Sequence, residues 1–207
     1  MPDATFLRNA LVNHPVRSLR STALPAAARP AAVLVALEPG QGVWLTRRSA
    51  HLSKHAGQVA LPGGTIDATD ASPEAAALRE AHEEIGLDPA QVELLGRLDD
   101  FPTGTGFHIT PITAILHGTP SFTPAPGEVD AIFRLDFTTL LNPAQPEWRR
   151  ATWHGGTRDY PVWPHPDHVI WGATAWILLR LAKALSGNAT STAGPSITDP
   201  RFVRSEY

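Results

Sequence analysis

The sequence has no cysteine among its 207 residues and no large excess of either charge sign. Without cysteine, the chain cannot form a disulfide, a thiolate metal site or a cysteine nucleophile. Lys and Arg number 17 against 20 Asp and Glu, which gives a formal net charge of −3. Because this balance offers no broad basic surface for a phosphate backbone, we expect no nucleic-acid partner.

The sequence also lacks a long, uninterrupted apolar run. The longest apolar stretch near the C-terminus, residues 169–185, contains Arg180 and Lys183 and is too polar to span a membrane. Charged residues such as Asp3 and Arg8 interrupt the N-terminal region, which therefore does not resemble a signal peptide. We expect no membrane partner and a cytoplasmic location.

The most informative stretch that is present contains three closely spaced carboxylates. Residues 79–87 read Arg-Glu-Ala-His-Glu-Glu-Ile-Gly-Leu, so Glu80 lies three residues before Glu83 and four before Glu84. On a helix these offsets place the three carboxylates on one face, where like charges repel each other and add no stability. Clustered carboxylate oxygens are the ligands that Mg²⁺ or Mn²⁺ prefers. A lone cluster of this kind is more often a solvated helix face.

The flanking residues predict a helix from Pro73 to Ile85. Ser72 is a favourable N-cap, and proline is well tolerated in the first helical turn. Gly86 follows at the usual position of a C-cap glycine. The expected helix therefore carries the carboxylates on one face and an apolar stripe roughly opposite.

A glycine pair, Gly63-Gly64, precedes this helix and allows a sharp turn close to a ligand. A Gly-Gly loop followed by R-E-x-x-E-E-x-G resembles the Nudix box. The resemblance implies an α/β fold, a Nudix-type α/β/α sandwich with a mixed β-sheet and a catalytic loop-helix-loop. It also implies site residues, of which Glu80, Glu83, Glu84 and the Gly63 carbonyl would bind metal, Glu83 and Glu84 would be catalytic, and Arg79, Gly64 and Gly86 would support the site structurally.

The chain departs from the box pattern at one position. The pattern has an acid six residues after the second glycine, then seven residues, then arginine. Here that acid is Asp70, and eight residues separate it from Arg79. Because aspartate is shorter than the usual glutamate, the sequence leaves the role of Asp70 open.

A second motif covers residues 45–64, which read LTRRSAHLSKHAGQVALPGG. This segment closely resembles the signature of the coenzyme A pyrophosphatase branch of Nudix hydrolases, and the resemblance extends over roughly residues 30–185. The matching residues are Arg48, Ser49, Leu52, His55, Gly57, Gln58 and Val59.

We expect four residues of this second motif to bind substrate phosphates: Arg47, Arg48, Lys54 and His55. An arginine fork can hold a phosphate through two hydrogen bonds. Two structural roles remain as alternatives. Arg48 would pair with an acid of the box helix, or His55 and Gln58 would fix the loop before a strand.

Glu128 is a further catalytic candidate, because it follows a Pro-Ala-Pro-Gly turn at the expected start of a strand. Many Nudix enzymes use such a downstream acid as a metal ligand or base. The alternative is a solvated turn residue. Tryptophan residues such as Trp171 and Trp176, on the expected last helix (169–185), could stack an adenine, but we expect them in the core because large aromatics usually lie there.

We expect three parts in the chain: an N-terminal segment (1–30), the Nudix hydrolase domain (31–185), and a flexible segment with a C-terminal tail (186–207). Residues 25–30 read as a linker, and a homodimer through the tail is left open. The resemblance implies a metal-dependent hydrolase of a small diphosphate substrate, which splits coenzyme A or its derivatives into 3',5'-ADP and (acyl-)4'-phosphopantetheine. The alternatives are another substrate, such as ADP-ribose or a nucleoside triphosphate, and a non-catalytic Nudix-fold binding module.

Overall fold

The computed structural model describes the chain except for residues 13, 17–27, 154–155 and 188–207. The expected linker overlaps these gaps, and most of the expected flexible segment and tail lies outside the described residues. The elements in chain order are α1 (Ala4–Leu11), β1 (Arg29–Glu38), β2 (Gly42–Arg48), β3 (Val59–Ala60), β4 (Gly63–Thr65), α2 (Pro73–Ile85), the 3₁₀ turn η1 (Pro89–Gln91), β5 (Val92–Arg97), β6 (Phe101–Pro102), β7 (Phe107–Leu116), β8 (Val129–Asp136), α3 (Phe137–Leu140), β9 (Glu147–Trp153), β10 (Gly156–Val162) and α4 (Gly172–Leu185).

The main sheet is mixed and has the order β3-β2-β1-β7-β5, with β4 on β1, β6 on β7 and β8 on β2. Its central pair, β1 and β7, runs parallel from Arg29↔Phe107 to Leu37↔Ile115, while the other pairs are antiparallel. Strand β1 pairs with β4 near its start and with β2 only at Leu37 and Glu38. The loop between β3 and β4 therefore lies where the partners of β1 change.

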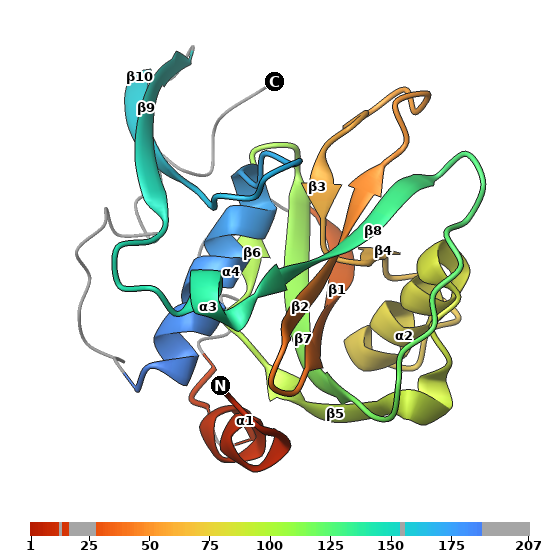
Figure 1. Cartoon of the computed structure of the whole chain (residues 1–207). Helices are drawn as coiled ribbons and strands as arrows, with labels where there is room; N and C mark the ends of the chain where they lie inside the picture. Colours follow the sequence, from red (N-terminus) through yellow and green to blue (C-terminus); the bar gives the residue numbers. More distant parts are fainter. Residues whose placement is uncertain (13, 17–27, 154–155, 188–207) are drawn as a thin grey trace.

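Helices cover both faces of this sheet, as Figure 1 shows. Side chains alternate along β1, so Leu34 packs in the cluster under α2 and Val35 packs in the cluster with α1 and α4. Both side chains are fully buried. These layers confirm the α/β/α sandwich and the mixed sheet that the resemblance implied.

The structure corrects two element boundaries. The last helix begins at Gly172 and not at Val169, because Ile170 instead forms an isolated β-bridge with Trp163. Strand β8 begins at Val129, so Glu128 lies in the preceding turn and does not open the strand. In both places a contact or turn outside the local pattern sets the boundary.

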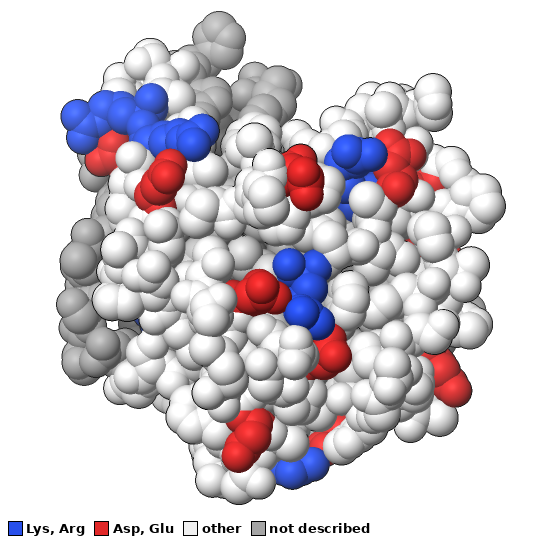
Figure 2. All heavy atoms as spheres, in the orientation of Figure 1, with Lys and Arg blue, Asp and Glu red and all other residues white. Residues whose placement is uncertain are grey.

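The hairpin of β9 and β10 forms a separate two-stranded sheet that stands beside α4 (Figure 1). Trp148 on β9 packs edge-on against Trp176 of α4, with ring centroids 5.7 Å apart. The face in Figure 2 carries acidic and basic side chains close together on a mostly uncharged surface. Within the described part of the chain, no helix is long and apolar enough to cross a membrane.

Candidate active site

Helix α2 is fixed at both ends by its own sequence. The Ser72 hydroxyl accepts a hydrogen bond from the Ala75 amide at 3.2 Å, and Gly86 ends the helix in the left-handed region with φ 66°. Apolar residues such as Ala81 and Ile85 are fully buried against the sheet. The predicted helix bounds are therefore confirmed, and the acidic face points away from this packed side.

Glu84 is the most buried of the three box carboxylates, with only 5% of its surface exposed. The Gly63 amide donates to Glu84 Oε2 at 3.1 Å, and Arg48 Nη1 lies 3.5 Å from Glu84 Oε1. Burial raises the pKa of Glu84 to about 7, and the Gly63 hydrogen bond and the Arg48 charge oppose that rise only in part. The site thus holds a carboxylate whose negative charge the neighbouring residues compensate poorly.

Glu80 and Glu83 share one arginine partner. Arg79 Nη1 donates to both Glu80 Oε1 and Glu83 Oε2 at 3.0 Å. Burial raises the pKa of Glu80, while the Arg79 hydrogen bond lowers it. Glu83 remains more than half exposed, so the acidic face runs from solvent at Glu83 to the interior at Glu84.

Asp70 anchors the other side of the Arg79 guanidinium. It accepts from Arg79 Nε at 3.0 Å and from Nη2 at 2.9 Å, a bidentate pair, and these bonds lower the pKa of Asp70. Asp70 also accepts from the Asp67 amide at 2.8 Å, which closes the turn before α2. Asp70, the acid at the irregular box position, therefore holds the Arg79 guanidinium in place.

The glycine pair packs tightly against the acids and the sheet. A Cβ on Gly64 would lie 2.6 Å from the Glu80 carboxylate, and a Cβ on Gly63 would lie 2.3 Å from the carbonyl oxygen of Ala32. Gly63 also has φ +151°, a conformation that L side chains rarely adopt. Gly63 is therefore required by the backbone around it, whereas a side chain on Gly64 would displace the Glu80 carboxylate.

The loop between β2 and β3 carries the second motif. Its ends meet where the Arg48 amide donates to the Gln58 carbonyl at 2.9 Å. His55 adopts φ 56°, unusual for a non-glycine residue, and its Nδ1 lies 3.0 Å from Gln58 Oε1. Asp130 holds the start of the loop by accepting from the Ala50 amide at 3.0 Å.

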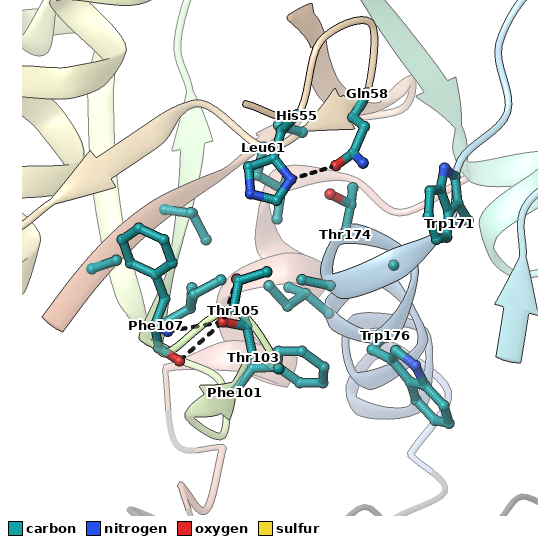
Figure 3. A pocket seen from close by; sticks show the side chains of 18 of the residues that line it. His55, Gln58, Leu61, Phe101, Thr103, Thr105, Phe107, Trp171, Thr174 and Trp176 are labelled. Carbon is teal, nitrogen blue, oxygen red and sulfur yellow. Dashed lines mark hydrogen bonds between the residues drawn. The ribbon is translucent and has the colours of Figure 1, made fainter. Parts of the chain in front are cut away.

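A cavity of about 430 Å³ adjoins this loop and the glycine pair. Figure 3 shows His55 and Gln58 at one side, Phe101 and Phe107 at another, and Trp171, just before α4, and Trp176 on α4 at a third. Arg48 and Gly63 line the cavity and also contact Glu84, so they connect it to the acidic face.

Only two of the four expected substrate-binding residues line the cavity. Arg48 and His55 line the cavity, whereas Arg47 and Lys54 do not. Arg47 lies instead 4.0 Å from Asp130. The structure also contains the contacts that the two structural alternatives expected. Arg48 approaches Glu84, an acid of the box helix, and His55 pairs with Gln58 in the loop before β3. Arg48 Nε is nevertheless buried without a hydrogen-bond partner, which leaves a donor for a ligand.

Glu128 lies within electrostatic range of the box acids. Its negative charge is one of the causes that raise the pKa of Glu84. Its carbonyl accepts from the Ser49 amide at 2.8 Å, so the turn before β8 is tied to the start of the second-motif loop. The side chain is exposed.

The acidic face suits a divalent cation in its chemistry. Its donors are hard carboxylate oxygens, and burial raises the pKa of both Glu84 and Glu80, as expected where a positive charge would be favourable. Among the described residues, no three acid or histidine side chains already stand at ligand spacing. Instead, the Glu80 and Glu83 carboxylates both accept from the same atom, Arg79 Nη1.

Sequence reasoning missed much of the cavity wall. Trp171 was expected in the core but is only half-buried and lines the cavity, and Trp176 is buried yet also lines it. Tyr160 on β10 contacts Trp171, with ring centroids 6.4 Å apart, and belongs to the same wall. The aromatic content of this region was visible in the sequence, but its convergence depends on how the hairpin and α4 pack.

Comparison with known proteins agrees with the box. A family model described as NUDIX domain matches residues 28–155. The Escherichia coli K12 protein named "Uncharacterized Nudix hydrolase NudL" is 40% identical over 160 residues, which cover 74% of this chain and 81% of that protein. The protein of that name from Shigella boydii serotype 18 shows the same identity and coverage.

Solved structures with this fold resemble the chain more distantly. RenU, a Nudix hydrolase from M. smegmatis, has 27% identity and a TM-score of 0.43 over 53% of this chain and 71% of its own. Scores of this size add no functional argument. The family match and the NudL relatives suffice: the chain belongs to the Nudix hydrolases, enzymes that act on phosphoric anhydrides and generally use divalent metal ions.

Proposed function

We propose that this protein hydrolyses the diphosphate of coenzyme A or its derivatives and releases 3',5'-ADP and (acyl-)4'-phosphopantetheine. One observation carries the proposal. Residues of the second motif, Arg48, His55, Gln58 and Val59, line a cavity that meets the Nudix box at Gly63 and Gly64. The motif that resembles the coenzyme A branch therefore adjoins the acids that would perform the cleavage.

The box residues have separate tasks in this proposal. Glu80, Glu83 and Glu84, with the Gly63 carbonyl, would hold Mg²⁺ or Mn²⁺. When bound, such an ion supplies charge neutralisation for the diphosphate and lowers the pKa of a water molecule. Arg79 keeps the Glu80 and Glu83 carboxylates oriented through its 3.0 Å hydrogen bonds.

The reaction needs a group to take the proton of the attacking water. Water oxygen forms the new bond to one phosphorus, the bridging P–O bond breaks, and the bridging oxygen leaves with the other phosphate. We assign the proton to Glu128 or Glu84, carboxylates close enough for the charge of one to raise the pKa of the other. Arg48, whose Nε is buried without a partner, would donate to a phosphate oxygen.

A turnover screen tests the proposal. Purified protein with Mg²⁺ or Mn²⁺ should convert coenzyme A to 3',5'-ADP, and excess EDTA should stop the reaction. ADP-ribose and nucleoside triphosphates run in parallel distinguish the alternatives. Efficient cleavage of ADP-ribose with none of coenzyme A would refute the substrate assignment, and binding without any product would indicate a non-catalytic module.

A further inference from the structure

Part of the cavity wall comes from residues that follow the segment matched by the family model. The family match ends at residue 155, whereas Tyr160 on β10 and Trp171, Trp176 and Ile177 around α4 line the cavity. The glycine pair and Arg48, on the near side, lie within the match. Both the matched segment and the residues that follow it therefore contribute to the cavity wall.

Several polar side chains of the cavity wall already have partners within the protein (Figure 3). His55 pairs with Gln58 at 3.0 Å, and the Thr103 hydroxyl accepts from the Phe107 amide at 2.9 Å. The Thr174 hydroxyl donates to the Val59 carbonyl at 2.9 Å. These internal pairs occupy polar groups that would otherwise meet the edge of a nucleobase.

Arg158 and Asp159 also line the cavity, but most of the remaining wall is apolar or aromatic. Phe101, Phe107 and Ile109 face Trp171 and Trp176 across the cavity, as Figure 3 shows for the labelled aromatic rings. The volume of about 430 Å³ lies within the range of small-molecule sites. Such a wall binds a chain of methyl and methylene groups through burial of apolar surface.

We propose that this cavity holds the pantetheine arm of the substrate and the acyl chain attached to it, with Trp171 and Trp176 as specificity-determining residues. The inference rests on the proposed function: the diphosphate lies at Gly63 and Arg48, and the pantetheine arm with any attached acyl group enters the cavity. The adenine end lies outside it. An attached acyl chain therefore raises kcat/KM relative to that for free coenzyme A.

Kinetics with matched substrates test this inference. The ratio of kcat/KM for octanoyl-coenzyme A to that for free coenzyme A should be at least ten, because each buried methylene improves binding about threefold to fourfold. Ala173→Leu, which fills the cavity from the first turn of α4, should reduce this ratio to about one. Ala90→Leu, on the exposed η1 turn, should leave it unchanged. Trp171→Ala should raise KM for the octanoyl compound about tenfold with kcat retained.

Equilibrium binding in EDTA separates this inference from the proposed function. Octanoyl-4'-phosphopantetheine should change tryptophan fluorescence in the wild-type protein and bind at least tenfold more weakly to Ala173→Leu. If coenzyme A is not cleaved but this binding is seen, the proposed function fails and the cavity assignment stands. A ratio near one in the wild type, or equal binding to both proteins, would overturn the assignment.

Discussion

Glu84 is a buried residue with a titratable carboxyl group, and it contacts two residues of the cavity wall, Gly63 and Arg48. Burial raises its pKa from 4.5 to about 7 in the folded protein. Between these values the unfolded chain loses the proton while the folded protein retains it. The free energy of unfolding therefore falls as pH rises from about 4.5 to about 7.

Glu84→Gln should remove this fall in the free energy of unfolding with rising pH, because glutamine does not titrate. Measured by urea unfolding in EDTA, the variant should gain stability relative to wild type as pH rises, by at most about 3 kcal/mol at pH 7.5. At pH 4.5 the two proteins should differ much less. A difference between the proteins that does not change with pH would contradict the buried-carboxylate account.

Gly64→Ala should impair catalysis more than folding. The new Cβ would lie 2.6 Å from the Glu80 carboxylate, the far end of a side chain that can move, so Glu80 is displaced while the backbone stays. We expect turnover to fall about tenfold or more, with the melting temperature nearly unchanged. Gly63→Ala is the contrasting variant, because its Cβ meets the Ala32 carbonyl at 2.3 Å and should lower the melting temperature. Equal effects of the two variants on stability would refute this distinction.

Glu128→Gln should reduce kcat more than it raises KM if Glu128 receives the proton or binds metal. Glu147→Gln is the matched control, since Glu147 is exposed and pairs with Arg149 at 3.2 Å on the separate hairpin. Asp130 is unsuitable as a control, because it holds the Ala50 amide. Normal turnover of the Glu128 variant would exclude it from the site.

Two kinds of contact hold helix α1 against the rest of the protein. Leu7 and Leu11 are buried in the core shared with α4, and Arg8 forms a bidentate pair with Glu93 on β5 at 2.6 and 2.8 Å. Leu7→Ala should destabilise the protein by about 3 kcal/mol. Arg8→Ala should cost much less than Leu7→Ala, because the arginine is partly exposed and water screens the pair. Urea unfolding that ranks them in the reverse order would show that the ion pair anchors the helix.

The boundaries of the helices and strands show which elements could be predicted from the sequence. Helix α2 has the predicted bounds because Ser72 and Gly86 fix its ends locally. The start of α4 was misplaced because Ile170 bridges to Trp163, a contact outside the helical pattern. Strand β4 was not predicted, since three residues form it only by pairing with β1.

At the scale of the whole molecule, the sequence indicated the chemistry of the site better than its shape. The box acids and the glycine pair are close in sequence, so their arrangement follows from one loop and one helix. The cavity requires residues from β7, β10 and α4 to meet the second-motif loop, and no local pattern encodes that meeting. For this reason the place of Trp171 and Tyr160 in the cavity wall became visible only in the structure.

The proposed function makes the acids of α2 essential for hydrolysis of the coenzyme A diphosphate. Its most direct test is hydrolysis in ¹⁸O-labelled water with Mn²⁺, with the products of wild type, Glu83→Gln and Glu84→Gln analysed by mass spectrometry. The account predicts 3',5'-ADP and 4'-phosphopantetheine from wild type, ¹⁸O in one of the two products, and turnover at least 100-fold lower in both variants. Near-normal turnover in both variants would contradict the account.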